Sequence, residues 1–263
     1  MSEETKENYK RIFGDPLYPE LHKPVRKGRL ITFEGVDGTG KSTQLEMLAA
    51  RMREEGYGVV VTKEPGSPVD PTDLGSAIRQ ILFHTVTTHN MARGVADCLF
   101  LADHIQHVAK VVEPALEKGL VVLSDRYSDS EWAYAPIKKT PGVILDAFQE
   151  FYGPLPDITV LFVASDVDAF LDRARQRRGD NNKQAGKAWA HTQDQIRIQQ
   201  EYLERLVGQD RTIVITVYPE QTPGQVFQMV WEAVQDKLQK PVEYIEGEKS
   251  HVVAVSDAVP QVE

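Results

Sequence analysis

The chain has 263 residues, of which 41% are hydrophobic, and its formal net charge is -9. This length and apolar content are sufficient for one large domain with a proper core, whereas the acidic balance disfavours a protein that coats nucleic acid. Cys98 is the single cysteine, which excludes an intrachain disulfide framework and a cysteine-cluster metal site, and we interpret it as a buried apolar thiol.

Short β-branched runs alternate with helical patterns along the chain. Each run is apolar on successive residues, which is typical of strands buried on both faces. The runs begin at Arg29, Gly58, Leu120, Ile158 and Arg211. Between them, apolar residues recur at helical spacing, as in Leu45, Leu48, Ala49 and Met52. Right-handed strand–helix–strand connections then predict an α/β fold with a parallel sheet covered by helices on both faces.

This alternation occupies residues 29–239, which we predict to be one domain. Residues 1–28 and 240–263 are charged or contain proline, and we interpret them as an N-terminal extension and a C-terminal tail. The first residues form no apolar signal segment, and the longest apolar run, Ile158–Ala164, is far shorter than a membrane span. We therefore expect a cytoplasmic protein that contacts neither membrane nor nucleic acid.

A glycine-rich stretch follows the first strand run and precedes a helical pattern. Residues 35–42 match G-x-x-x-x-G-K-[ST], and they occupy the strand-to-helix position that this phosphate-binding loop requires. Glycines let backbone N–H groups turn toward a phosphate, the lysine reaches the outer phosphates and the serine can bind Mg²⁺. The alternative is a flexible connector with an exposed lysine. The predicted nucleotide-binding residues are Gly35, Gly38, Thr39, Gly40, Lys41, Ser42 and Thr43.

The third strand run ends in Asp125, followed by Arg126. A carboxylate at this position is expected to hold Mg²⁺ through water in proteins with such a loop. The alternative is an ordinary ion pair at a strand end. Together, the loop and Asp125 indicate either an enzyme of nucleotide-dependent phosphoryl transfer or a nucleotide switch.

Basic residues gather after the fourth strand run, and no N-K-x-D guanine-binding motif accompanies them. Helical spacing places Arg173 and Arg177 on one face, and the segment after them resembles a mobile lid. Cations in such a lid can close over the transferring phosphates. The alternative is a solvated basic helix. The cluster consists of Arg173, Arg175, Arg177, Arg178, Lys183 and Lys187.

Four motifs, in this order, resemble those of the thymidylate kinases, a family of P-loop nucleoside-monophosphate kinases. They are FEGVDGTGKSTQ, TKEPGSP, LFLADHIQHV and SDRYSDSEWAY, and the resemblance covers roughly residues 29–239. It implies a five-stranded parallel sheet, a mobile arginine-rich lid, ATP as phosphoryl donor with Mg²⁺, and usually a homodimer. The acceptor it implies is a deoxynucleoside monophosphate, most readily dTMP.

The resemblance also implies roles for individual residues in binding the substrate. Ser130 belongs to the same D-R-Y motif as Arg126, and His104 and Glu131 take positions that face the nucleobase in the family. With Lys41, Asp37 and Arg126, the lid residues Arg173 and Arg177 complete the expected catalytic set. The other implied roles are Asp37 near the acceptor sugar and attacking phosphate, Glu64 supporting the site, Arg79 and Arg126 contacting the monophosphate, Phe100 stacking on the base, and Tyr134 beside the sugar.

Several departures from the family pattern gather around the base. The family usually has arginine at His104, a small or amide residue at Glu131, and glutamine at Ala135. An ionised Glu131 near a thymine carbonyl would repel it, unless the side chain turns into solvent. Alternative acceptors are therefore a modified dUMP, dCMP or dGMP. A P-loop switch with slow hydrolysis is an alternative of another class, and the acidic balance disfavours a kinase of polynucleotide ends.

Histidines are the remaining candidates for metal or acid–base chemistry. His84, His89, His104 and His107 show no constellation with carboxylates in the sequence that demands a metal ion. We interpret them as ordinary helix or loop residues.

Overall fold

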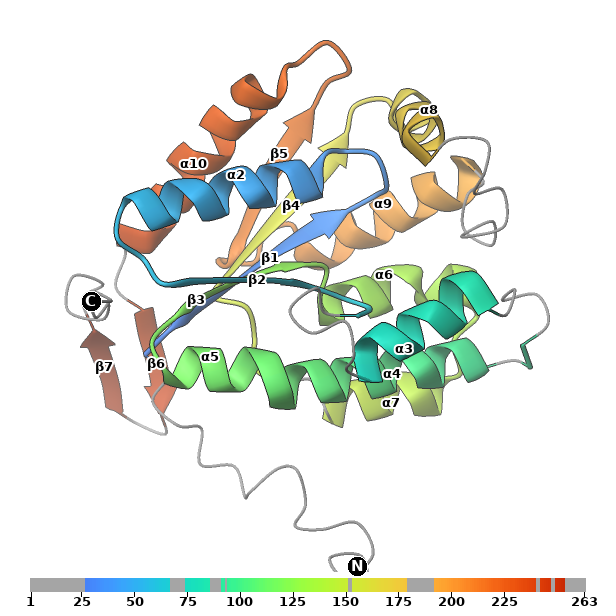
Figure 1. Ribbon diagram of the computed structural model, residues 1–263, viewed down its shortest axis with the longest axis horizontal. Coiled ribbons are helices and arrows are strands. Elements are labelled where there is room, and N and C mark those ends of the chain that lie inside the picture. The colour runs from blue at the N-terminus through green and yellow to red at the C-terminus, as the bar shows by residue number, and fades with distance from the viewer. Residues whose placement is uncertain are drawn as a thin grey trace, which may run out of the picture.

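A computed structural model describes residues 27–66, 74–85, 91–92, 94–150, 153–178, 192–239, 242–246 and 249–253 (Figure 1). Most of the predicted N-terminal extension lies outside these ranges. His89 and the lid residues Lys183 and Lys187 lie outside them too. The described part of the predicted tail holds an antiparallel hairpin of β6 (Val242–Glu246) and β7 (Lys249–Val253).

Five parallel strands form the central sheet, which confirms the predicted fold class. Their order is β2-β3-β1-β4-β5, and each begins within one residue of the predicted run. Phe33 pairs with Asp125 on one side and Val160 on the other, so β1 lies in the middle and its carboxyl end adjoins that of β3. The strands are β1 (Arg29–Gly35), β2 (Val59–Lys63), β3 (Val121–Asp125), β4 (Ile158–Ala164) and β5 (Thr212–Val217).

Helices cover both faces of this sheet (Figure 1). On one face lie α2 (Lys41–Glu54) and α10 (Pro223–Gln239), and on the other α5 (Glu113–Glu117), α6 (Ser128–Lys138) and α9 (Thr192–Leu206). The remaining helices are α3 (Leu74–Gln80), α4 (Val95–His107), α7 (Gly142–Glu150) and α8 (Val167–Arg178), with π-helical turns η1 (Ile81–Thr85) and η3 (Val108–Val112) following α3 and α4.

Burial on both faces is confirmed for the inner strands only. In β1, β3 and β4 almost every residue is buried, whereas β2 is largely half-buried and Val214 of β5 is 43% exposed. The reason is position, because β2 and β5 form the edges of the sheet, where the covering layers of helices end. The apolar runs therefore identified the strands correctly but not which strands are central.

The interpretation of Cys98 as a buried thiol is wrong, because the side chain is exposed. On α4 the buried face carries Asp97 and His104, seven residues apart. A helix turns by 100° per residue, so Cys98 points away from the face that its neighbour Asp97 buries.

The carboxyl edge of the sheet contains a topological switch point. From β1 the chain passes over β3 to reach β2, whereas from β3 it passes over β1 to reach β4. These two connections run in opposite directions across the sheet. In open α/β sheets, ligands bind beyond the carboxyl ends of the strands at such a point. The glycine-rich loop and Asp125 both lie at this edge.

Candidate functional site

The loop between β1 and α2 has a backbone path that requires glycine. Gly35, Gly38 and Gly40 have φ angles of 127°, 88° and 92°. A Cβ atom at Gly35 would lie 2.2 Å from the Phe162 carbonyl oxygen, and one at Gly38 would lie 2.0 Å from that of Phe170. Gly35 and Gly38 therefore let the loop pack directly against β4 and α8, whereas a Cβ at Gly40, just before α2, would meet nothing within 4 Å. This backbone path is the one that lets loop N–H groups and a helix start bind a phosphate.

Lys41 begins α2 and folds back over this loop. Its side chain is buried, at 7% exposure, and Nζ donates a hydrogen bond to the Val36 carbonyl oxygen at 2.8 Å. Burial, followed by the charge of Arg126, lowers the pKa of Lys41 to about 8. Because this ammonium is already largely desolvated, a phosphate oxygen can replace the Val36 carbonyl at a small additional cost.

Ser42 and Asp125 meet where α2 begins and β3 ends. Ser42 Oγ donates a hydrogen bond to Asp125 Oδ2 at 2.5 Å. The sequence predicts both residues as Mg²⁺ ligands, and the fold brings them into direct contact. A hydroxyl beside a carboxylate is the hard oxygen environment that Mg²⁺ prefers, so these residues fit the ion.

Arg126 forms a clamp on the opposite side of the loop. It has a φ of 74°, unusual for a non-glycine residue. Its Nη2 donates to Asp37 Oδ1 at 2.7 Å, and its Nη1 lies 3.2 Å from Ser130 Oγ. The guanidinium also lies 5.2 Å from the ring centroid of Tyr134. The fold thus joins four residues that the sequence assigns to the acceptor.

Glu34 supports this clamp from beneath and was not identified from the sequence. Its carboxyl group is fully buried and accepts hydrogen bonds from the Tyr127 backbone N–H and from the hydroxyls of Ser130 and Tyr202. The Tyr202 hydroxyl also accepts from Arg126 Nη1 at 3.2 Å. Burial, with a smaller contribution from the charge of Asp129, raises the pKa of Glu34 to about 8.

Helix α9 supplies a second residue that sequence reasoning missed. Gln195 is buried, its Oε1 accepts a hydrogen bond from the Asp37 backbone N–H at 3.3 Å, and it hydrogen-bonds Tyr134. The amphipathic pattern of α9 predicts an inward face, but pattern alone does not tell which polar residue on that face meets the loop. With Tyr202, Gln195 makes α9 one wall of the site.

Glu64 lies at the end of β2, between two imidazoles. His104 Nδ1 lies 2.9 Å and His107 Nδ1 2.6 Å from Glu64 Oε1, and His107 Nε2 lies 2.7 Å from Thr62 Oγ1. Burial alone would raise the pKa of Glu64, but the charge of His104 and the hydrogen bonds from both rings lower it to about 2. Two of the four histidines, His104 and His107, thus share one carboxylate. Within the described residues, no cluster of His, Cys, Asp and Glu has an arrangement that could hold a metal ion.

His104 is a buried residue of the protein interior rather than an exposed residue on a pocket wall. Its side chain is 1% exposed, and its ring packs against Tyr127 and Phe148. Arg79 lies nearby, donating to the Pro65 carbonyl oxygen at 2.7 Å and stacking over Phe83. Contacts of His104 with a base and of Arg79 with a phosphate remain predictions.

Phe100 on α4 faces an ion-paired lysine. Lys138 Nζ lies 4.6 Å from the Phe100 ring centroid, and the Phe83 ring packs against Phe100 edge-on at 6.5 Å. The same ammonium lies 2.6 Å from Glu131 Oε2 and 3.1 Å from Asp97 Oδ1. Glu131 is therefore neither a lone carboxylate beside the base nor a side chain in open solvent.

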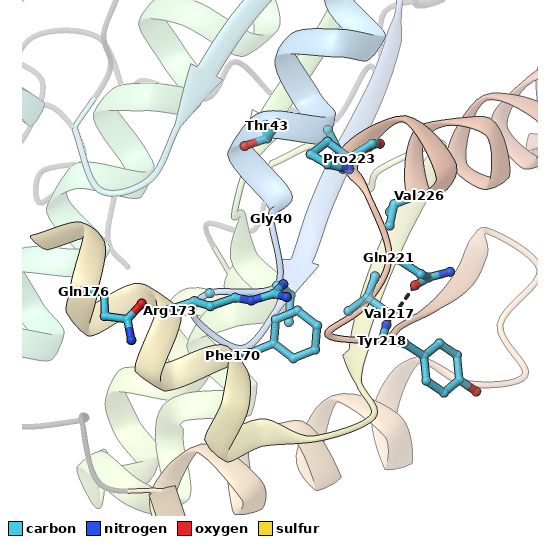
Figure 2. Close-up of a pocket in the computed structure, with 13 residues that line it drawn as sticks. Gly40, Thr43, Phe170, Arg173, Gln176, Val217, Tyr218, Gln221, Pro223 and Val226 are labelled. Carbon is cyan, nitrogen blue, oxygen red and sulfur yellow. Dashed lines mark hydrogen bonds between the residues drawn. The ribbon is translucent and has the colours of Figure 1, made fainter.

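A pocket of about 440 Å³ opens on the other side of the glycine-rich loop (Figure 2). Its walls come from the loop, from α8 and from the turn between β5 and α10. Arg173 crosses this pocket from α8, packs over the Phe170 ring and donates a hydrogen bond to the Pro219 carbonyl oxygen. Residues that line the pocket include Gly38, Thr39, Gly40, Thr43, Arg173 and Tyr218.

The predicted lid is described only in part. Helix α8 ends at Arg178, and residues 179–191 lie outside the described ranges, as do the side chains of Arg175, Arg177 and Arg178. Arg173 thus lies beside the glycine-rich loop, with which it lines the same pocket, whereas closure of Arg177 over phosphates stays a prediction.

Comparison with known proteins gives a consistent result. The family model described as thymidylate kinase matches residues 33–230. A thymidylate kinase of Bifidobacterium longum subsp. infantis is 37% identical over 218 residues, or 81% of this chain and 86% of that protein. One from Clavibacter sepedonicus is 45% identical over 159 residues, which cover 57% of this chain and 71% of the relative.

A solved structure is also similar. The crystal structure of thymidylate kinase from Ehrlichia chaffeensis has a TM-score of 0.56 and 27% sequence identity, covering 79% of this chain and 98% of that one.

Within the described residues, none of the helices combines the length and apolar character needed to cross a membrane.

Proposed function

Since this chain belongs to the thymidylate kinase family, we propose that it transfers the γ-phosphoryl group of ATP to dTMP, giving dTDP and ADP. The observation that carries this proposal is the pair of cations on either side of Asp37. Lys41 Nζ bonds the Val36 carbonyl oxygen at 2.8 Å and Arg126 Nη2 bonds Asp37 Oδ1 at 2.7 Å, so both cations are held at consecutive residues of the loop. Two fixed cations facing one space suit two phosphate groups that must approach each other.

The donor nucleotide is held by the loop and the pocket beside it. Backbone N–H groups bind the β-phosphate, and Lys41 follows the γ-phosphoryl group as it moves. The pocket between α8 and the β5–α10 turn accommodates the base, with Arg173 across its entrance. When bound at Ser42 and Asp125, Mg²⁺ neutralises charge on the donor phosphates.

The acceptor monophosphate is held by the clamp. Arg126 exchanges part of its contact with Asp37 and Ser130 for phosphate oxygens, and Asp37 and Tyr134 adjoin the sugar. Since the attacking phosphate oxygen is already ionised at neutral pH, no general base is required. Catalysis consists of alignment and charge neutralisation by Lys41, Arg126 and, on closure, Arg173 and Arg177.

Assembly and location are further parts of the proposal. A homodimer is supported by the family resemblance and by the apolar side chains of Leu74, Ile81 and Val95, which α3, η1 and α4 expose at 52%, 37% and 42%. Light scattering of the purified protein tests this. An enzyme that consumes ATP and a deoxynucleotide is expected in the cytoplasm.

One assay tests the reaction against the alternatives. ADP formation is measured with ATP and Mg²⁺ alone and then with dTMP, dUMP, dCMP or dGMP added. We expect turnover that depends on an added monophosphate and is fastest with dTMP. Equal ATP hydrolysis with and without monophosphate would instead indicate a P-loop switch.

A further inference from the structure

A lysine with two carboxylates lies buried between α4 and α6, next to Phe100. The side chains of Lys138, Asp97 and Glu131 are 4%, 5% and 12% exposed. Lys138 Nζ bonds to both carboxylates, and Asp97 Oδ1 also accepts a hydrogen bond from Thr140 Oγ1 at 2.9 Å. We name Lys138, Glu131 and Asp97 the Lys138 triad.

Structural stability alone is a poor explanation for this triad. Burying three charged groups carries a desolvation cost that the ion pairs offset only in part, and apolar residues of similar volume often stabilise a fold as well or better. The triad also carries one excess negative charge. A buried, charged group with directed donors and acceptors beside an aromatic face is more typical of a ligand site.

The position of the ammonium bears on what can stack on Phe100. Nζ lies 4.6 Å from the ring centroid, within the range of cation–π contacts. A planar base on that face would take the space of the ammonium and move it to the edge of the base. Four rotatable bonds permit that movement, and Asp97, anchored by Thr140, remains a counterion.

We propose that Lys138 and Glu131 together select the nucleobase, with Lys138 donating a hydrogen bond to a ring carbonyl and Glu131 accepting one from the adjacent ring N–H. This inference rests on the proposed function and specifies its substrate class, a deoxynucleotide of a 2,4-dioxopyrimidine. Such a base presents a carbonyl acceptor directly beside an N–H donor, which matches an ammonium beside a carboxylate.

Other bases match this pair less well. Neutral cytosine has an unprotonated N3, a hydrogen-bond acceptor that the Glu131 carboxylate repels. Guanine presents the same carbonyl and N–H order as thymine, so only the size of the site can exclude it. The repulsion expected of a lone Glu131 toward thymine disappears, because Lys138 supplies the donor for the carbonyl and Glu131 meets the N–H.

The test replaces Lys138 alone, and then Lys138 and Glu131 together. Lys138→Met removes the donor and leaves two carboxylates together. The double variant Lys138→Met/Glu131→Gln offers donor and acceptor from one amide and leaves Asp97, held by Thr140, as the remaining carboxylate of the triad. Lys139→Met, at the exposed neighbouring lysine, is the control. For each protein, kcat and KM are measured with dTMP and dCMP, and dTMP affinity is measured by calorimetry without ATP.

We expect Lys138→Met to reduce the preference for dTMP over dCMP at least ~10-fold, equivalent to about 1.4 kcal/mol, mainly through a higher KM for dTMP. The double variant regains most of the preference, and Lys139→Met keeps it. If Lys138→Met lowers kcat/KM equally for dTMP and dCMP, the triad has only a structural role. If Lys138→Met lowers the KM for dTMP, Lys138 hinders binding of the base. Either result overturns the proposal.

Failure of the proposed function is recognised separately. A wild-type protein that binds dTMP without phosphorylating it contradicts the kinase proposal, while the calorimetric comparison of Lys138→Met with wild type still tests the base contact. A wild-type protein that binds or phosphorylates dCMP better than dTMP contradicts the inference itself.

Discussion

Tyr202 donates a hydrogen bond to Glu34 at 2.8 Å, across 168 residues of sequence. The same hydroxyl lies 3.2 Å from Arg126 Nη1. Glu34 precedes the glycine-rich loop by one residue, and Tyr202 lies on the helix that follows the predicted lid. This contact therefore links the glycine-rich loop, Arg126 and α9 through one buried carboxyl group.

Protonation of Glu34 predicts a pH dependence of stability. Its folded-state pKa is raised to about 8, by burial and then by Asp129, against lowering effects of Arg126, Ser130 and Tyr202. The folded protein thus holds this proton between about pH 4.5 and 8 while the unfolded chain releases it, so the contribution to stability is lost as the pH rises through that window, at most about 1.4 kcal/mol per pH unit.

Glu34→Gln imitates the protonated carboxyl group and should flatten this fall. We expect urea denaturation midpoints of the variant to change less than those of wild type between pH 5 and 8.5, with kcat at pH 7 within ~3-fold, because the neutral form already predominates there. Parallel curves for the two proteins would show that Glu34 is ionised in the fold.

Lys41 should contribute mainly to the transition state. Replacing it by Met keeps the length of a side chain that is 7% exposed and removes a desolvated ammonium, so the fold should survive. We expect kcat to fall at least ~10²-fold, as for other preorganised charges at developing negative charge. Circular dichroism checks folding, and near-normal turnover by a folded variant would falsify the role of the loop.

Asp125 should determine the Mg²⁺ requirement. Asp125→Asn retains an oxygen that can accept the Ser42 hydrogen bond but loses the negative charge. We expect the Mg²⁺ concentration for half-maximal activity to rise ~10- to 100-fold, a range typical for groups that support a bound metal. The measurement is activity across a magnesium titration at fixed ATP. An unchanged titration would remove Asp125 from the metal site.

Two glycines with nearly equal φ angles allow the cost of a left-handed backbone to be measured separately from that of a steric clash. Gly38 and Gly208 have φ of 88° and 89°, but only at Gly38 would a Cβ meet other atoms, at 2.0 Å from the Phe170 carbonyl oxygen. Gly208→Ala should cost about 1–2 kcal/mol for the left-handed backbone, and Gly38→Ala a further ~1–3 kcal/mol for the clash. Thermal melts of both variants measure the two losses in the free energy of unfolding. Equal losses would mean that the loop around Gly38 can move to relieve the clash at little cost.

The lid prediction concerns Arg173 and Arg177. If both act on closure, replacing both with Ala should lower kcat ~10-fold or more while nucleotide affinity changes less. Arg197→Ala, on exposed α9 surface, is the control. Protease should cut first between Arg178 and Lys187 without ligand, and a bisubstrate analogue should protect that span. Identical cleavage with and without the analogue would indicate no closure.

The sequence alone determined the strands, their alternation with helices along residues 29–239, and the glycine-rich loop. The five runs, the glycine pattern from Gly35 to Gly40 and the strand ending at Asp125 are local features, because hydrophobic periodicity and loop backbone geometry depend on neighbouring residues. Family resemblance added Asp37, Arg126 and Phe100. The placement of Asp37 and Arg126 at one edge follows from the parallel sheet, because they come after the carboxyl ends of β1 and β3, whereas Phe100 depends on how α4 packs.

Only the tertiary structure decided which polar groups meet inside. The partners of Glu34, the imidazoles around Glu64 and the pairing of Lys138 with Glu131 and Asp97 were not visible in the sequence, and Cys98 proved exposed. Such contacts join distant helices and strands, and a shift of one helical position turns a side chain by 100° from core to solvent. Periodicity identifies the face of a helix, but the atoms that meet across two packed faces depend on how those faces dock.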